Sequence, residues 1–197
     1  MSMAIEEWPA NVCPAQMSWG MVYNNRDFSS TLNNSQQIVG YPGSYWKCSL
    51  ALPPLTRDRD RIVTAFIGRL QGRFGTFKLP AFTRRRTDNI GAPVVLGGLA
   101  MASHITLGAV PVNRKVFSQG DYITIDGVMH EVVEDVVSDG QGVAVLPLNR
   151  RLREALVSGT PVEYRNPYSI MRLSEDSYTL SVRPVVAELT LECREAF

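Results

Sequence analysis

Apolar and polar residues alternate over much of this chain, and the clearest alternation lies between Gly120 and Val133. Two short runs of β-forming residues flank the pair Asp126-Gly127. A two-residue type I′ turn needs positive φ at both central positions, and Asp-Gly adopts this conformation readily. The stretch therefore predicts a β-hairpin that turns at Asp126 and Gly127. Nothing in it is typical of a catalytic site.

Two further stretches alternate with the same regularity. Between Tyr45 and Leu52, every second residue is apolar: Trp46, Cys48, Leu50 and Leu52. Near the end of the chain, Leu189, Leu191 and Cys193 share one face, and Glu188, Thr190 and Glu192 share the other. Each pattern predicts a half-buried strand. Weaker signals predict strands at 19–23, 36–39, 74–79, 104–107, 143–146, 162–164, 168–173 and 178–182.

Turn-forming residues separate these strands. Asn24 to Asp27 predicts a turn, Phe28 to Asn34 a loop or a weak edge strand, and Gly40 to Gly43 a further turn. Asn149 to Val157 is expected to form one or two turns of helix.

A longer helix is predicted to start at Thr56. Threonine is a good N-cap, and Asp58 and Asp60 fall in the first turns, where the helix dipole favours acids. Apolar residues then recur at helical spacing, and Gly72 is a suitable stop. The apolar stripe comprises Ile62, Val63, Phe66, Ile67 and Leu70. The opposite face carries Arg57, Arg61 and Arg69, which favours a solvated face or an ion-paired contact over nucleic-acid binding.

The order of these elements predicts a split β domain with a second β module inserted into it. Residues 1–84 and 167–197 form the first domain, which carries the helix and receives the final strand. Residues 85–166 form the insert, a compact all-β module expected to be a small barrel. Arg84-Arg85-Arg86 and Asn166-Pro167 mark its two borders.

Composition and charge narrow the function without defining it. The chain has 197 residues, 45% of them hydrophobic, and a net charge of +1. The charges are unevenly distributed: residues 51–90 hold nine Lys or Arg and three Asp, whereas residues 116–148 hold six acids and no Lys or Arg. This pattern is consistent with two interpretations. The basic and the acidic stretch could each form a solvated face, or they could form two docking surfaces of complementary charge. No apolar run is long enough for a membrane helix, and the N-terminal residues do not resemble a secretion signal.

The sequence offers little for catalysis, and we expect no enzyme activity, cofactor or metal site. The two histidines, His104 and His130, are too few for a His-rich metal centre. Three widely spaced cysteines (Cys13, Cys48 and Cys193) exclude a disulfide framework and are expected to be reduced, in or near the core. No HExxH, GxSxG or phosphate-binding loop is present. Trp8, Trp19 and Trp46 could instead form a carbohydrate platform, although a core position is favoured for Trp46.

Three blocks of the sequence together resemble a known family. The first contains Trp19, Asn24, Phe28, Gln37, Pro42-Gly43, Trp46 and Cys48 to Leu55. The second is the helix followed by Gly72, Gly75 and Phe77, and the third runs from Gly120-Asp121 through Asp139-Gly140 to Tyr164. This pattern resembles tail proteins of long-tailed bacteriophages, most closely the distal tail protein group at the tail tip.

The resemblance implies a non-enzymatic structural protein of the virion, made in the cytoplasm of the host bacterium. It implies a tail-tube-like β-sandwich or barrel with one flanking helix, assembled as a ring that is expected to be a hexamer. The expected partners are other copies of the chain, the tail tube protein, and the hub and fibre or receptor-binding proteins, with DNA only in transit through the channel and no membrane. Such a channel should not grip DNA, which predicts that Arg84 to Arg86 do not line it.

Other functions remain open from the sequence alone. The chain could be a tube or tail-terminator protein, a baseplate component outside the ring, a carbohydrate-binding β module, or an arginine-mediated nucleic-acid binder. Within the ring hypothesis, the basic middle of the chain and the acidic stretch around the Asp126-Gly127 hairpin are the candidate complementary surfaces.

Overall fold

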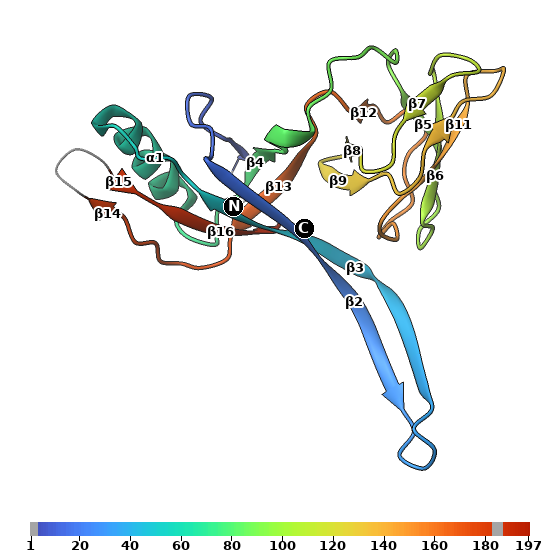
Figure 1. Ribbon diagram of the computed structural model, residues 1–197, viewed down its shortest axis with the longest axis horizontal. Helices are drawn as coiled ribbons and strands as arrows, with labels where there is room; N and C mark the ends of the chain where they lie inside the picture. Colours follow the sequence, from blue (N-terminus) through green and yellow to red (C-terminus); the bar gives the residue numbers. More distant parts are fainter. Residues whose placement is uncertain (1–3, 183–186) are drawn as a thin grey trace. The chain divides into compact units, whose positions relative to one another are not determined.

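The computed structural model describes residues 4–182 and 187–197, and the chain separates into two compact units (Figure 1). The first unit contains residues 1–21, 45–82 and 168–197, and the second contains residues 22–44 and 83–167. This division differs from the sequence-based one chiefly in residues 22–44, which group with the second unit. The protein is mainly β, with one α-helix and several sheets, none of them closed in the described part of the chain.

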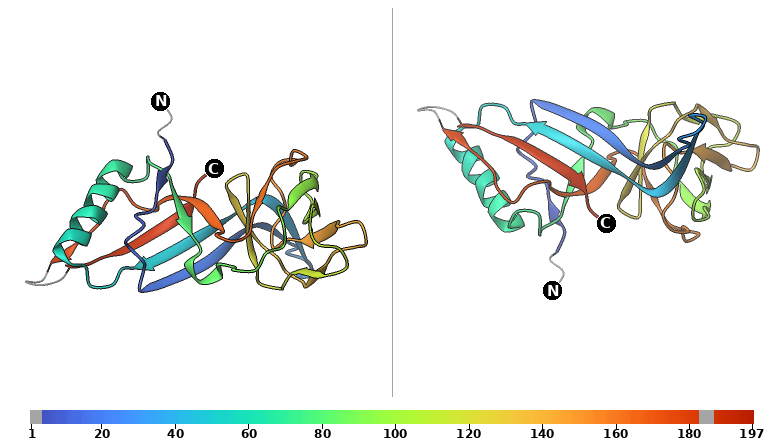
Figure 2. Two further views of the ribbon diagram at one scale, coloured as in Figure 1. Left: turned by 90° about the horizontal axis from the view of Figure 1, so that it is seen from above. Right: turned by 90° about the horizontal axis from the view of Figure 1, so that it is seen from below.

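The first unit is built on a six-stranded sheet with the strand order β1-β4-β13-β16-β3-β2. β1 runs parallel to β4, whereas the β4–β13, β13–β16 and β16–β3 pairs are antiparallel. The prediction that the final strand inserts into this sheet is confirmed, because β16 lies between β13 and β3 (Figure 2). The strands are β1 (Glu6–Glu7), β2 (Gln16–Ser29), β3 (Gln36–Ala51), β4 (Phe77–Pro80), β13 (Tyr168–Leu173) and β16 (Thr190–Glu195). A separate two-stranded sheet pairs β14 (Ser181–Val182) with β15 (Ala187–Glu188).

One helix, α1 (Arg57–Leu70), covers one face of the six-stranded sheet. Val63, Phe66, Ile67 and Leu70 are buried in the same core as the predicted apolar faces of β3 and β16. The predicted start and end are confirmed, although the Thr56 side chain forms no capping hydrogen bond. Ile62 was expected in the apolar stripe but is 41% exposed. A short 3-10 helix, η1 (Phe82–Arg84), follows β4.

The second unit packs three small sheets around its own core. Their strand pairs are β10–β7, β11–β6–β5 and β12–β8–β9. None of these sheets closes, so the barrel expected for residues 85–166 is not present as a continuous sheet in the part that is described. The strands are β5 (Val94–Gly97), β6 (His104–Gly108), β7 (Lys115–Phe117), β8 (Tyr122–Ile125), β9 (Val128–Glu131), β10 (Val136–Val137), β11 (Ala144–Pro147) and β12 (Val162–Glu163).

The hairpin predicted at Asp126 and Gly127 is confirmed as the β8–β9 pair. Ile125 lies opposite Val128, so two residues form the turn. Their φ angles are 49° and 77°, the positive values that a type I′ turn requires. All four residues of β8 are buried, which places the hairpin inside the core of the second unit.

Four local predictions are wrong. Asn24 to Asp27 lies inside the 14-residue strand β2, and Gly40 to Gly43 lies inside the 16-residue strand β3. The chain reverses instead at residues 30–35, which overlap the segment 28–34 predicted to be a loop or a weak edge strand, and Asn34 has a φ of 54°. Residues 149–157 form no helix, because their backbone bonds cross to another loop: Leu156 N donates to Gly98 O and Met101 N to Leu152 O. Residues 178–180 are not in a strand, and the start of the last predicted strand, at Val186, lies outside the described residues.

Candidate functional site

Residues 22–44 form an exposed hairpin segment with no core of its own. Residues 23–29 of β2 and 31–38 of the turn and β3 are all exposed. Large apolar side chains are nevertheless present: Tyr23, Phe28, Leu32, Ile38 and Tyr41 are between 43% and 96% exposed. A two-stranded ribbon is marginally stable alone in water, and exposed apolar side chains of this size commonly mark an interaction surface.

The backbone edges of this hairpin segment are also open. Among the described strands, β2 is the last in its sheet, and β16 pairs with β3 only from Lys47 to Ala51. Proteins usually protect such edges with lysines, prolines or short strands. Residues 22–44 contain no lysine and one proline, Pro42. Their charged residues are one arginine and one aspartate, Arg26 and Asp27. The hairpin segment therefore offers unprotected edges to another β-strand.

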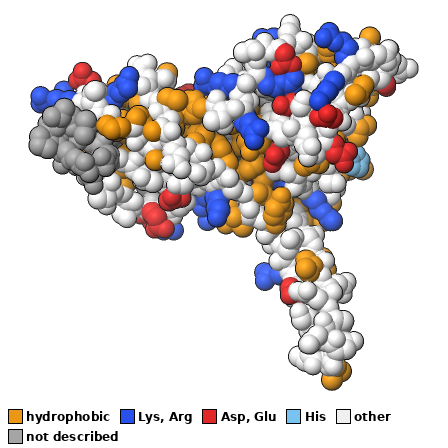
Figure 3. All heavy atoms as spheres, in the orientation of Figure 1, with side chains coloured by type: hydrophobic (Ala, Val, Ile, Leu, Met, Phe, Trp, Pro, Cys, Tyr) orange, Lys and Arg blue, Asp and Glu red, His pale blue; other side chains and the backbone are white. Residues whose placement is uncertain are grey.

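One face of the hairpin segment is hollowed. Asn24, Arg26 and Phe28 of β2 line this hollow together with Tyr41 and Pro42 of β3. Asn24 also donates its side-chain amide to the Pro42 carbonyl, at 3.0 Å. Figure 3 shows the hairpin carrying apolar patches with few charges. Aromatic residues and arginine are the residue types that dominate protein–protein binding energy.

An arginine clamp holds the base of the hairpin segment within the second unit. Arg150 donates to the Ser44 carbonyl at 2.9 Å and to the Met129 carbonyl at 2.6 Å, and Arg153 donates to the same Ser44 carbonyl at 2.7 Å. Arg150 is 5% exposed and Ser44 is 6% exposed. Charge-assisted hydrogen bonds between buried groups are strong, so this clamp fixes residue 44 against β9.

His130 lies beside the arginine clamp, buried in β9. Burial, followed by the positive charges of Arg150 and Arg153, holds its pKa well below the ordinary value of 6.5. Its Nδ1 atom has no hydrogen-bond partner among the described residues. The folded protein therefore holds the His130 imidazole in its neutral form. Its buried position indicates a structural role.

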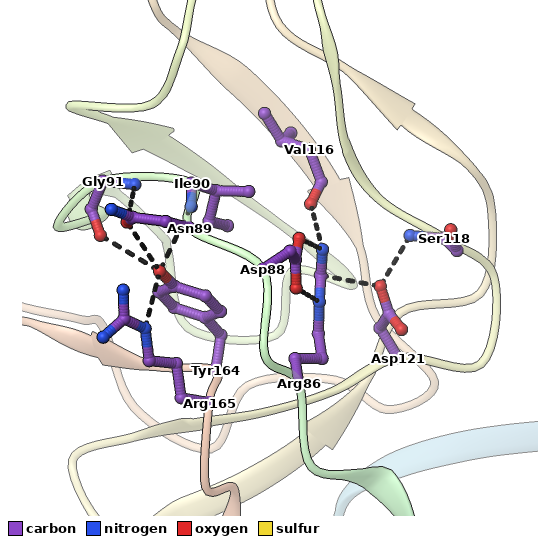
Figure 4. Close-up of polar contacts among 10 residues, drawn as sticks. All are labelled: Arg86, Asp88, Asn89, Ile90, Gly91, Val116, Ser118, Asp121, Tyr164 and Arg165. Atoms are coloured by element: carbon purple, nitrogen blue, oxygen red, sulfur yellow. Dashed lines mark hydrogen bonds and ion pairs between the residues drawn. The ribbon is translucent and has the colours of Figure 1, made fainter.

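Of the three adjacent arginines, Arg86 is engaged in contacts within the second unit, whereas Arg84 and Arg85 are exposed. Arg86 is mostly buried, ion-paired to Asp88 and to Asp121 at 2.8 Å, and bonded to the Val116 carbonyl at 3.1 Å (Figure 4). The pairing with Arg86 is the main cause that lowers the pKa of Asp88. The Arg84 guanidinium lies 5.2 Å from the centre of the Tyr122 ring. Within the second unit, Arg86 thus links the segment after η1 to β7 and β8.

Tyr164 makes a neighbouring set of bonds at the other border of the module. Its hydroxyl accepts from the Ile90 amide at 3.2 Å and lies 3.2 Å from the Gly91 carbonyl (Figure 4). The backbone joins the same two segments, because Arg86 N donates to Arg165 O at 3.0 Å. The predicted module borders therefore meet side by side within the second unit.

Three of the six acids of the predicted acidic surface bind other groups of the same chain. Asp121 binds Arg86, Asp135 binds Lys115 at 2.7 Å, and Asp139 accepts from the amides of Gln141 and Val143. Asp126 and Glu134 are exposed. The sixth acid, Glu131, lies at the end of β9, so the six acids are distributed over one strand and several loops.

The tryptophans and cysteines serve mainly the core. Trp8 and Trp46 are buried, and Trp19 packs edge-on against Trp46, with ring centroids 5.8 Å apart. This arrangement disfavours a carbohydrate platform. Cys48 and Cys193 lie opposite each other in β3 and β16, and both are buried, whereas Cys13 is exposed, contrary to expectation. Burial raises the pKa of Cys48 to about 12 and raises that of Cys193 as well.

The described residues contain no group of three or more His, Cys, Asp or Glu arranged to hold a metal. They also contain no helix long and apolar enough to cross a membrane. No protein-family model matches the sequence, and a search of the curated proteins gives no match. Sequence reasoning missed the hairpin segment, although Asn33-Asn34 at its turn was an available signal, because asparagine tolerates positive φ.

Proposed function

We propose that this protein is a structural component of the tail of a long-tailed bacteriophage, a distal tail protein that assembles as a ring at the tail tip. In this proposal the ring is a hexamer that joins the tail tube to the hub and fibre proteins and leaves a channel for DNA. The first unit, a sheet covered by a single helix on one face, would supply the tail-tube-like domain.

The observation that carries this proposal is the exposed hairpin segment. It exposes five large apolar side chains and open strand edges on a ribbon that the rest of the described chain does not cover. A chain of this kind gains stability when copies cover one another's hairpins. The burial of Trp8 and Trp46 favours this assembly role over carbohydrate binding.

Light scattering coupled to size-exclusion chromatography, over a series of protein concentrations, tests the proposal. The wild-type chain is expected to form particles of six copies, visible as rings by electron microscopy. Replacing Tyr23, Phe28 and Ile38 together by serine should shift the particles to monomers. The melting temperature of the monomer should change little, because all three side chains are more than half exposed.

A matched control replaces three exposed apolar residues of the second unit outside the hairpin: Leu99, Val145 and Val157, which are 77%, 56% and 75% exposed. This triple serine variant should assemble like the wild type. A wild-type chain that stays monomeric at every concentration would contradict the proposal, as would equal dissociation of both variants. Genes for a tape-measure protein and a hub protein are the expected neighbours of the gene.

A further inference from the structure

The six-stranded sheet of the first unit has a second face, opposite α1, that carries charged side chains. Successive strand residues point to opposite faces, and Cys48, Met171 and Cys193 are in the core under the helix. Lys47, Arg172 and Arg194, their neighbours in sequence, therefore lie on the face without the helix. Lys47 and Arg194 are exposed, and Arg172 is partly exposed.

These three side chains form a cationic row across three adjacent strands. Arg194 of β16 lies opposite Lys47 of β3 on one side and opposite Arg172 of β13 on the other. Neighbouring strands are about 4.8 Å apart, so the row places three positive charges within about 10 Å. Like charges directly opposite each other destabilise a sheet, so the fold alone does not account for the row.

No ion pair within the described chain neutralises the cationic row. Elsewhere in the same unit, Arg69, Arg73 and Lys78 each pair with an acid within 3.1 Å. Arg194 instead lies over the Tyr45 ring, 5.5 Å from its centre, and the buried Nε of Arg172 has no hydrogen-bond partner among the described residues. The one acid of the next register row is Glu192, opposite Ser49. A buried donor without a partner indicates a missing acceptor.

We infer that the cationic row binds the phosphate backbone of nucleic acid. The row has the positive charge for successive phosphates, and its register neighbours on one side, Ser49 and Glu192, are polar. A stable protein partner would require an apolar centre with a polar rim, whereas protein–DNA interfaces are more polar and more positive. Contacts to phosphate carry no sequence information, so binding should be independent of sequence.

This inference does not depend on ring formation. If the proposed ring is correct, DNA binding by the cationic row changes the expectation that the channel does not grip DNA. The sheet face with the cationic row would then be a place of weak, transient contact during DNA passage. Three contacts for each copy are few, so the affinity of a single chain should be low and strongly dependent on salt.

The test measures binding of a short duplex DNA of mixed sequence by fluorescence anisotropy, between about 50 mM and 200 mM salt. The test variant combines Lys47→Gln, Arg172→Gln and Arg194→Gln. A matched control, Arg57→Gln with Arg59→Gln and Arg61→Gln, removes the same charge from exposed positions of α1 in the same unit. The row variant is expected to bind at least about ten-fold more weakly at low salt. The slope of log K against log salt should fall by about 3, one for each contact.

The control variant is expected to keep both the affinity and the slope of the wild type. The thermal stability of the row variant should be equal to or above that of the wild type, because the repulsion between like charges is removed. The single change Lys47→Gln provides a milder second variant. Equal loss in the row and control variants would overturn the inference, as would no loss in either. Tighter binding of the row to poly-glutamate than to DNA would also overturn it, in favour of an acidic protein partner.

Discussion

Two hairpins of the protein differ in almost every respect. The β8–β9 hairpin has four-residue strands, a two-residue turn and a first strand that is buried throughout. The hairpin of β2 and β3 is formed by strands of 14 and 16 residues, and its distal half is exposed on both faces. The short hairpin serves the core, whereas the long one exposes apolar side chains for which the described chain provides no cover.

The difference shows that a longer hairpin is not for that reason a more stable one. The short hairpin is stabilised by its turn and by burial, which act within one chain. The long one depends on the arginine clamp at its base and, in our proposal, on other copies of the protein. The following predictions therefore pair each change in one of the two hairpins with a matched control position.

The largest effect is expected for Ile123→Ala in β8. Ile123 is completely buried, so truncation leaves a cavity and should lower the free energy of unfolding by about 3 kcal/mol. The matched change in the long hairpin, Ile38→Ala, removes the same atoms from a side chain that is 62% exposed and should cost less than about 0.5 kcal/mol. Denaturant unfolding of the monomer measures both, and similar costs would refute the contrast.

A second prediction concerns the pH dependence given by His130 in β9. Its pKa is lowered in the folded protein, so below about pH 6.5 the unfolded chain takes up a proton that the folded chain does not. Stability is therefore greatest above this pH and falls as the pH decreases, by up to about 1.4 kcal/mol per pH unit, until the folded-state pKa is reached.

The change His130→Gln should remove most of this slope between pH 7 and pH 5. His104 is the natural control, because it is the other histidine and is exposed. His104→Gln should leave the slope unchanged. A slope that persists in His130→Gln would assign the pH dependence to other groups.

The short hairpin could be predicted from the sequence because its information is local. Asp126-Gly127 specifies the turn, and the alternation of apolar residues specifies the faces. The same holds for α1 and for the alternating buried residues of β3 and β16. In these elements a core on one side gives the apolar residues a regular spacing.

The long hairpin could not be predicted because its distal half lacks these constraints. With no core on either face, nothing enforces alternation, and Gly40 to Gly43 resembles a turn. In the structure, the β3 backbone instead accommodates Gly43 at a φ of 106°, and Asn24 bonds across to Pro42. The pairing of Arg86 with Asp121, the arginine clamp and the cationic row all depend on contacts distant in sequence, which composition and spacing do not reveal.

A third prediction is smaller and tests the turn of the short hairpin. Gly127 has a φ of 77°, so Gly127→Ala forces a side chain into the left-handed region and should cost about 1 kcal/mol. Gly97→Ala in the same unit is the control, since its φ is not positive and an added Cβ has open space. Thermal unfolding of both variants measures the difference. Equal costs would show that the turn does not limit this hairpin.

The smallest effect is expected for Asn24→Ala in the long hairpin. The bond from Asn24 to the Pro42 carbonyl is exposed, so its loss should lower the global stability by no more than about 0.5 kcal/mol. Locally, however, it links the two strands where β3 is irregular, so amide hydrogen exchange of residues 22–44 should become faster. Asn25→Ala, at the adjacent position of β2, should leave exchange unchanged. If exchange in the long hairpin is equally fast in the wild-type monomer and in both variants, the isolated ribbon is already open, and its order must come entirely from the arginine clamp and from partner copies.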